Sequence, residues 1–314
     1  MVTAAVLVVA LAATAPAALA QKHPAAPRPD LTIEDAAITH PAGEQPFVFQ
    51  NQRNPKISIS DRNVNVGRGR AGRSVTKVYL EHGGKRWLLA KRKVGPIAPG
   101  AQDFGHDVLV DTMNFPLGAY TAEICADANH ANRESTRKPQ CARAGALDFI
   151  VAAARWTGSV SGEYDPALGN VEKWTSSNAE LAFSSDEAGG IFEYAFLGTV
   201  TWTSSGTDDD GCVWSGSGSQ TFTTEDQPIG SFSVDYKHEE YSGSFALGKQ
   251  IYQANVACPG GGDSMAAAPE APGIIASGLG GPAPLPFGST SLPGSPTHGL
   301  LGTTFNWNLR PAAP

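Results

Sequence analysis

Short runs in which apolar and polar residues alternate recur roughly every ten residues through the first half of the chain. Residues 57–60 alternate strictly and residues 75–80 less so, and Gly- and Pro-containing turns such as those at 82–84 and 98–100 separate the runs. A period of two places apolar side chains on one face of a strand, and Gly and Pro between such runs are typical of turns. This pattern predicts a β-sandwich over residues 28–153.

The composition changes at Arg155, after which Thr, Ser, Gly and aromatic residues dominate. Residues 199–203 and 212–215 flank a polar loop that ends in Gly, which predicts a hairpin. Residues 301–309 show the cleanest alternation of the chain, with Leu, Thr, Phe, Trp and Leu on one face. We therefore predict a second, acidic β-sandwich over residues 155–310, and an all-β fold class with two β-sandwich domains.

The second domain is interrupted by a tract rich in Pro, Gly and Ala at residues 259–299. The tract has too few bulky apolar residues to build a core of its own. We expect a flexible insertion, after which the final strand returns to close the sheet.

Residues 1–20 form an apolar run that ends in Ala-Leu-Ala, as in a signal peptide with its cleavage site, although no Lys or Arg precedes Lys22. A membrane-spanning helix is the alternative, but it needs about 20 apolar residues, and Thr14 and Pro16 interrupt this run. We expect a secreted protein, extracellular or associated with the cell envelope, that has no membrane span once the signal is removed.

Four cysteines occur in the chain, and an even number in an exported protein predicts two disulfides. Four cysteines allow three pairings, and we expect Cys125–Cys141 and Cys212–Cys258, because each of these pairs lies within one proposed domain. A structural zinc site usually contains close C-x₂₋₄-C pairs, which this chain lacks. We expect no cofactor.

Charge divides the chain into two halves. Residues 28–153 contain 17 basic and 13 acidic residues, whereas residues 154–314 contain 5 basic and 17 acidic residues. Such asymmetry supports two separately folding units. We expect no nucleic-acid partner, since phosphate repels the acidic half. The basic stretch 91–94, with Lys85 and Arg86, is interpreted as a solvated strand and turn face, with a polyanion site as the alternative.

Several motifs of the first domain occur in a specific order over about 120 residues. They are Asn65-Val66-Gly67-Arg68-Gly69, Ser74, Val78-Tyr79-Leu80, Ile97-Ala98-Pro99-Gly100, Pro116-Leu117-Gly118-Ala119-Tyr120 and Cys125-Ala126-Asp127. Together these motifs resemble the bacterial cell-adhesion-related domain (CARDB), an immunoglobulin-like β-sandwich. This resemblance implies an immunoglobulin-like first domain, an extracellular role in adhesion or ligand presentation, and no catalytic residues.

The loop over residues 126–146 carries Asp127 and Glu134, which also fit the pattern of the resembled family. A calcium site needs several convergent oxygen ligands, whereas the charges of Arg133, Arg137 and Lys138 oppose cation binding. We therefore expect a polar loop strapped at its base by a disulfide.

Two further candidate sites lie around the predicted hairpin of the second domain. Trp202 and Trp214 flank it and are candidates for an exposed sugar-stacking platform, although large aromatic residues also build sandwich cores, and we favour a core role for most tryptophans here. Asp208, Asp209 and Asp210 form a candidate cation site, with a solubilising loop tip as the favoured alternative.

No catalytic constellation emerges from the sequence. The run 262–266 (Gly-Asp-Ser-Met-Ala) is similar to a hydrolase serine motif but lies in the Pro/Gly tract, and 238–241 (His-Glu-Glu-Tyr) lacks the second His of a zinc-protease motif. We expect a non-enzymatic adhesion or ligand-binding module whose partner is a cell-envelope component, a carbohydrate or a protein. A secreted polysaccharide hydrolase acting through the C-terminal domain is the alternative, and a structural spacer is a third possibility.

Overall fold

The computed structural model describes a chain built from strands, and the predicted all-β fold class is confirmed. This part of the chain contains no helix with the length and apolar character that a membrane-spanning segment needs. The described residues are 25–39, 46–105, 108–110, 114–134, 140–143, 149–164, 171–187, 190–207, 209–223, 230–246, 253–261, 264–267, 275–276, 282–293, 297–298 and 303–312. The predicted signal peptide, residues 1–20, lies outside them.

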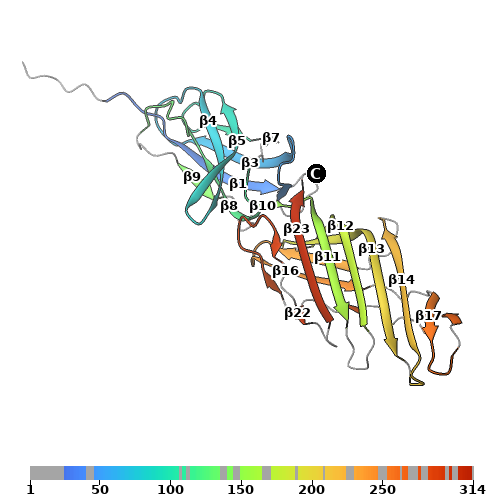
Figure 1. Cartoon of the computed structure of the whole chain (residues 1–314). Coiled ribbons are helices and arrows are strands. Elements are labelled where there is room, and N and C mark those ends of the chain that lie inside the picture. Colours follow the sequence, from blue (N-terminus) through green and yellow to red (C-terminus); the bar gives the residue numbers. More distant parts are fainter. Residues whose placement is uncertain are drawn as a thin grey trace, which may run out of the picture.

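The first unit contains two sheets, which lie at one end of an elongated molecule (Figure 1). One sheet consists of β1 (Leu31–Thr39), β3 (Lys56–Asn65), β6 (Gln102–Phe104) and β7 (Val108–Leu109). The other consists of β2 (Phe47–Phe49), β10 (Phe149–Ala152), β8 (Gly118–Cys125), β4 (Ser74–His82), β5 (Lys85–Val94) and β9 (Cys141–Arg143).

The core of the first unit follows from alternation along these strands. In β4 every second residue from Ser74 to Leu80 is buried, and β8 shows the same period from Gly118 to Ile124. Ile57 and Ile59 of β3 are buried as well, as their strict alternation with serine predicts.

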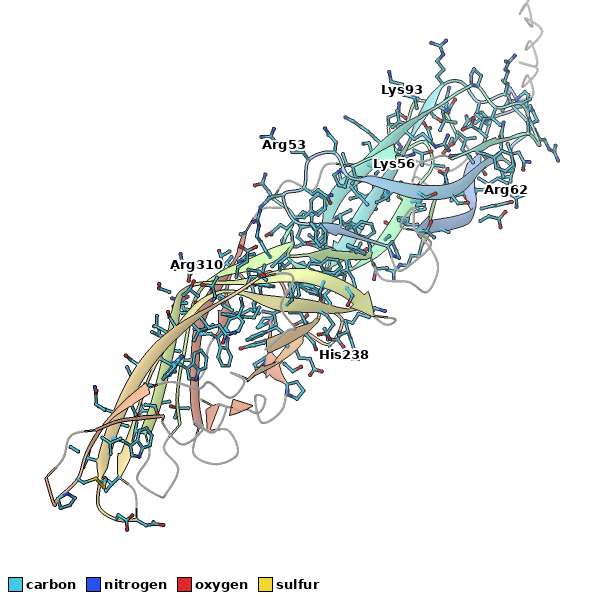
Figure 2. All side chains as sticks on the ribbon, turned by 90° about the vertical axis from the view of Figure 1, so that its right-hand side faces the viewer. Arg53, Lys56, Arg62, Lys93, His238 and Arg310 are labelled. Carbon is cyan, nitrogen blue, oxygen red and sulfur yellow. A yellow bond between two sulfur atoms is a disulfide. The ribbon has the colours of Figure 1, made fainter. Side chains whose placement is uncertain are left out.

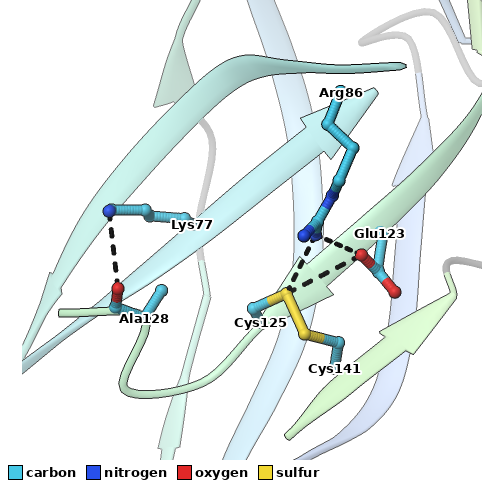
Figure 3. Close-up of a disulfide and its surroundings, with 6 residues drawn as sticks. All are labelled: Lys77, Arg86, Glu123, Cys125, Ala128 and Cys141. Carbon is cyan, nitrogen blue, oxygen red and sulfur yellow. Dashed lines mark hydrogen bonds and ion pairs between the residues drawn. A yellow bond between two sulfur atoms is a disulfide. The ribbon is translucent and has the colours of Figure 1, made fainter. Parts of the chain in front are cut away.

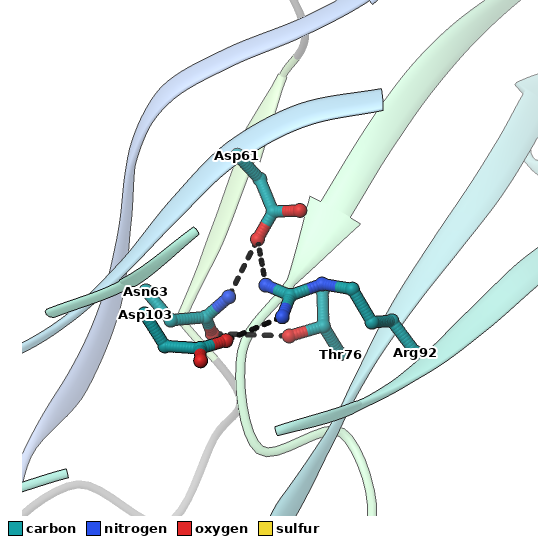
Figure 4. A network of polar contacts seen from close by, with 5 residues as sticks. All are labelled: Asp61, Asn63, Thr76, Arg92 and Asp103. Atoms are coloured by element: carbon teal, nitrogen blue, oxygen red, sulfur yellow. Dashed lines mark hydrogen bonds and ion pairs between the residues drawn. The ribbon is translucent and has the colours of Figure 1, made fainter. Parts of the chain in front are cut away.

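A polar network is buried within this unit (Figure 4). Arg92 donates from Nη2 to Asp61 Oδ2 at 2.6 Å and forms a second ion pair with Asp103. Asn63 also donates to Asp61 Oδ2, at 2.5 Å, and accepts a hydrogen bond from the Thr76 hydroxyl at 3.0 Å. The charge of Arg92 is therefore neutralised inside the unit, so this member of the basic stretch 91–94 does not contribute a solvated cation.

The strands from β11 onwards join into one large curled antiparallel sheet. Its central strands are β14 (Val213–Phe222), β13 (Ile191–Thr207), β12 (Val171–Glu187), β11 (Arg155–Tyr164) and β23 (Thr303–Ala312), in that spatial order. Two further strands, β15 (Gly230–Asp235) and β16 (Glu240–Ala246), continue the sheet from the other half of β13. The predicted hairpin of 199–203 and 212–215 is confirmed as the β13–β14 pair.

The two faces of the long strands differ sharply in chemistry. Along β13, Val200 and Trp202 point inward and are buried, whereas Thr201 and Thr203 are exposed. The inward tryptophans lie over glycines of neighbouring strands: a Cβ on Gly218 would come within 2.2 Å of the Trp202 ring, and one on Gly162 within 2.4 Å of the Trp174 ring. Glycine is required at these two positions because the indole rings occupy the space of a side chain.

The sequence predicts a flexible excursion for the Pro/Gly-rich insertion at 259–299. The described segments of this insertion instead include short strands. Its short strands pair with the sheet: β18 (Ser264–Ala267) with β17 (Gln253–Ala257), β19 (Ile275–Ala276) and β20 (Ala283–Pro284) with β16, and β21 (Leu292–Pro293) and β22 (Thr297–His298) with β23. Leu285 and Leu292 are buried, so the few bulky residues of the tract act as anchors onto a core that other strands supply.

Candidate functional site

The two units meet at a short connection whose backbone is clamped by two tyrosines. The Tyr194 hydroxyl donates to the carbonyl of Ala153 at 2.8 Å, and the amide of Ala153 donates to the Tyr236 hydroxyl at 2.9 Å. The two hydroxyls are 3.1 Å apart, and because the hydrogen of Tyr194 is already used, Tyr236 donates in this contact. Burial raises the pKa of Tyr236 to about 12, so its hydroxyl stays protonated at neutral pH.

Aromatic residues of both units pack around this clamp. Phe47 of β2 makes edge-to-face contact with Phe192 of β13, with ring centroids 5.2 Å apart, and Phe49 makes the same kind of contact with Phe183 at 5.1 Å. Such aromatic pairs stabilise a contact by more than the burial of their apolar area alone contributes. The connection between the units is therefore packed on both sides and does not behave as an open linker.

A second contact between the units comes from the Pro/Gly-rich tract. Phe287 lies flat against the imidazole of His82, with ring centroids 3.7 Å apart and an interplanar angle of 4°. It also packs against Tyr120, and a Cβ on Gly118 would come within 2.4 Å of its ring. The amide of Gly288 donates to the carbonyl of Leu117 at 2.8 Å. These contacts fix the turn that carries Phe287 onto the first unit.

A cleft of about 320 Å³ opens beside this second contact and is lined by both units. The first unit contributes the end of β4, the start of β8 and the end of β9, and the second contributes the turn between β15 and β16. The volume lies in the range of small-ligand sites, about 300–1,000 Å³. Its chemistry is polar and carries both signs of charge, with Glu81, His82, Tyr120, Arg143, Lys237 and Glu239 among its lining residues.

The structure places Trp202 and Trp214 on the inner face of the curled sheet, where only 8% and 7% of their surfaces are exposed. The expectation that they form an exposed sugar-stacking platform is therefore wrong. Because successive side chains of a strand point to opposite faces, the adjacent residues Thr201, Thr203 and Ser215 take the outer face and the tryptophans take the inner one. The core role favoured for the other tryptophans agrees with the burial of Trp156, Trp174 and Trp307.

The candidate cation site at the hairpin tip is only partly described. Asp208 lies outside the described residues, and Asp209 and Asp210 are exposed in the turn between β13 and β14. Among the described residues, one group of three or more potential metal ligands is close enough to share an ion, and it consists of Glu123, Cys125 and Cys141. Both of its sulfur atoms are already used in a disulfide, so this group is not a metal site.

Both predicted disulfides, Cys125–Cys141 and Cys212–Cys258, are confirmed, and no described cysteine is free. Cys125 and Cys141 are direct cross-strand partners on β8 and β9 (Figure 3). Arg86 pairs with Glu123 beside this disulfide and also lies over the Tyr79 ring. The sulfur chemistry of this cluster is therefore structural, and two disulfides indicate an oxidising environment.

The loop between these cysteines is polar and organised by its carboxylates. Asp127 is buried and accepts hydrogen bonds from the amides of Ala131 and Asn132, both at 3.0 Å. Glu134 accepts a hydrogen bond from the amide of Leu31 at 3.1 Å, which ties the loop to β1. The pKa of Glu134 is raised to about 7, chiefly by burial and to a smaller extent by the nearby carboxylates of Asp127 and Asp30, while the hydrogen bond from the Leu31 amide opposes this shift.

The motif at 65–69 also has a structural explanation. The fully buried side chain of Asn65 accepts hydrogen bonds from the amides of Asp30 and Gly67, both at 3.1 Å. It donates to the carbonyls of Gly69 and Ile97, at 2.8 and 3.1 Å. A Cβ on Gly67 would come within 2.4 Å of the Asp30 amide nitrogen, so the glycine allows the chain before β1 to approach. These residues act as a clasp, not as a binding site.

No protein-family model matches the chain, and searches of curated proteins and of solved structures find no match either. Of the features described, the junction cleft alone combines a cavity of ligand size with several charged groups from two units. Sequence reasoning missed it because its residues belong to turns and strand ends that are spread along the chain from Glu81 to Glu239.

Proposed function

We propose that the chain is a secreted or surface-associated, non-catalytic binding protein whose junction cleft holds a charged saccharide of the cell envelope. The observation that carries this proposal is the preformed polar cleft between two units whose arrangement is fixed by aromatic packing. A ligand that enters it does not have to order the connection between the units, so less conformational entropy is lost on binding.

The lining of the cleft favours a saccharide with charged substituents. Arg143 and Lys237 provide cationic donors for carboxylate or phosphate groups, and Glu81 and Glu239 provide acceptors for hydroxyl or amino groups. The Tyr120 ring is largely buried in the floor, with its hydroxyl donating to the carbonyl of Pro116 at 2.6 Å. An apolar small molecule would leave these charged groups desolvated, which is costly.

Two other observations support an extracellular binding role. Both disulfides are typical of proteins that function in oxidising compartments. The resemblance of residues 28–153 to the CARDB family supports adhesion or ligand presentation. Under this proposal the first unit is an immunoglobulin-like module, and the second unit completes the ligand site.

The proposal is tested by sedimentation of the purified mature chain with insoluble cell envelope and with charged and neutral polysaccharides. The variant Arg143→Ala/Lys237→Ala removes both cations from the cleft. The matched control Lys93→Ala/Arg310→Ala removes one Lys and one Arg outside it; both are exposed, and in Figure 2 Arg310 lies on the opposite side of the second unit from the His238 turn.

The proposal predicts that the native chain and the control are retained on charged material, whereas the cleft variant loses at least tenfold in affinity, since each charge-assisted hydrogen bond contributes about 1.5–3 kcal/mol. Equal loss in both double variants would show nonspecific electrostatic binding and would contradict the proposal. Absence of retention on every saccharide would contradict it as well.

One observation favours the hydrolase alternative enough to justify a separate assay. Two carboxylates, Glu81 and Glu239, line the same cleft, and paired carboxylates are the catalytic groups of most glycoside hydrolases. Release of soluble reducing sugars from envelope polysaccharide, abolished in both Glu81→Gln and Glu239→Gln, would replace the binding role with catalysis. Binding without release supports the non-catalytic role.

A further inference from the structure

The imidazole of His82 is held in one orientation at the edge of the cleft. Phe287 stacks on one face of the ring, and Nδ1 lies 3.1 Å from the carbonyl oxygen of Ala119. A carbonyl oxygen can only accept a hydrogen bond, so Nδ1 carries the hydrogen. In the neutral ring, Nε2 is therefore the atom with the free electron pair.

The second unit places a carboxylate in front of this electron pair. Glu239 Oε1 lies 3.8 Å from His82 Nε2, which is too long for a hydrogen bond. The backbone of Glu239 is fixed in the turn between β15 and β16, with a φ of 56°, and its carbonyl accepts from the amide of Leu285 at 2.6 Å. His82 Nε2 and Glu239 Oε1 thus face each other across the junction between the units. The contacts that hold the His82 ring are separate from those that fix the Glu239 backbone.

The distance between the two donor atoms suits a shared metal ion. Zinc binds imidazole nitrogen at about 2.0–2.1 Å and carboxylate oxygen at about 2.0–2.2 Å, so at a tetrahedral angle the two ligand atoms lie about 3.4 Å apart. A shift of roughly 0.4 Å closes the gap from the observed separation, and the Glu239 side chain, which is 43% exposed, is free enough to make it. The hydrogen bond from Nδ1 to a backbone carbonyl is also the usual second partner of a metal-bound histidine.

We propose that His82 Nε2 and Glu239 Oε1 bind a borderline divalent metal ion of the zinc type, which bridges the two units, with water completing its coordination. Imidazole selects zinc, copper and nickel over calcium and magnesium, which prefer oxygen ligands alone. Lys237 and Arg143 line the same cleft, and their positive charge weakens cation binding, whereas Glu81 partly offsets it. The expected affinity is therefore lower than that of a zinc site with three or four protein ligands.

The first test is calorimetric titration of the mature chain with zinc chloride at neutral pH, with calcium and magnesium chloride as comparisons. One zinc ion should bind per chain, and the other two metals should produce no binding heat. His82→Ala and Glu239→Gln should each weaken zinc binding by about tenfold or more, since each removes or neutralises one ligand. The Gln variant preserves the shape of a half-exposed side chain, so its result does not depend on refolding around a cavity.

A matched control separates this site from adventitious surface binding. His238 belongs to the same turn, is exposed, and has Nδ1 2.6 Å from Asp235 Oδ2, so it is the natural competitor for a surface zinc ion. His238→Ala should leave zinc affinity unchanged. Loss of binding in His238→Ala with retention in His82→Ala and Glu239→Gln would overturn the proposal, as would zinc binding that none of the three variants alters.

The bridging geometry adds a second readout. Because the two ligands come from different units, zinc should raise the melting temperature of the native chain and of His238→Ala, and this rise should be absent in Glu239→Gln. A rise of equal size in Glu239→Gln would show that the metal does not connect the units at this position. This outcome is independent of whether any saccharide enters the cleft.

Discussion

The Tyr194 hydroxyl and the carbonyl oxygen of Ala153 lie 2.8 Å apart, which joins the longest strand pair of the second unit to the last residues of the first. Tyr236 completes the clamp through the Ala153 amide. A connection between sheets is usually exposed and mobile. Here it is enclosed on both sides, so bending between the units requires breaking buried hydrogen bonds.

Tyr236→Phe tests this clamp. The substitution leaves the Ala153 amide without its acceptor in a buried position, which should lower the free energy of unfolding by about 1–3 kcal/mol. Urea denaturation monitored by tryptophan fluorescence measures the change. Tyr79→Phe, at a half-buried position of the first unit, is the control and should change stability by less than about 0.5 kcal/mol. Equal effects of the two variants would show that the clamp contributes nothing specific.

Glu134 should make stability depend on pH near neutrality. Its pKa is about 7 in the folded chain against an ordinary value of 4.5, so between these values the folded state binds one more proton than the unfolded state. Stability should therefore fall as pH rises through this window, by up to about 3 kcal/mol, and level off above it.

Glu134→Gln removes this proton linkage and keeps an oxygen that accepts from the Leu31 amide. Its denaturation midpoint should change less between about pH 5 and pH 8 than that of the native chain. Relative to the native chain, the variant should therefore be stabilised more at about pH 8 than at about pH 5. An identical pH dependence in both chains would refute the role of Glu134. Asp209→Asn, at an exposed turn position, serves as the charge-matched control.

Trp202→Ala should destabilise the second unit by about 3–5 kcal/mol, because it opens a cavity against Gly218 and Trp174. Thr201→Ala is the matched control, since Thr201 is the adjacent residue on the exposed face of the same strand. Thermal unfolding followed by circular dichroism distinguishes the two. A similar small effect in both variants would argue against the buried position of Trp202.

Asn65→Ala should be among the most destabilising substitutions in the first unit. It leaves four backbone groups without their buried partner, from Asp30, Gly67, Gly69 and Ile97, which costs about 3 kcal/mol or more. Asn306→Ala, at an exposed position of β23, should be nearly neutral. If chemical denaturation gives similar midpoints for both variants, the clasp is not a determinant of stability.

Local patterns predicted the elements that depend on neighbouring residues alone. The alternation at 301–309 corresponds to β23, in which Trp307 and Leu309 are buried. The hairpin around Gly211 and both disulfides likewise follow from short-range spacing. The burial of Trp202 and Trp214 could not be read from flanking residues, because it depends on which face of the sheet curls inward.

The junction lies further beyond sequence reasoning. His82 and Glu239 are separated by more than 150 positions, and each occupies a turn or strand end with no recurring pattern. The contact of Phe287 with His82 depends on a tract that composition alone describes as unstructured. Contacts of this kind form when two folded units dock. The alternation of apolar and polar residues within each strand contains no information about them.

The 17-residue length of β13 sets a physical scale for the second unit. At about 3.3 Å per residue this strand extends for roughly 55 Å, from the aromatic packing at Phe192 to the acidic turn at Asp209. Charges that far apart barely interact, because their separation is several times the Debye length, which is about 8 Å at physiological ionic strength. The cleft and the acidic tip therefore act as electrically independent ends, and a ligand held at one end leaves the other free to meet a different surface.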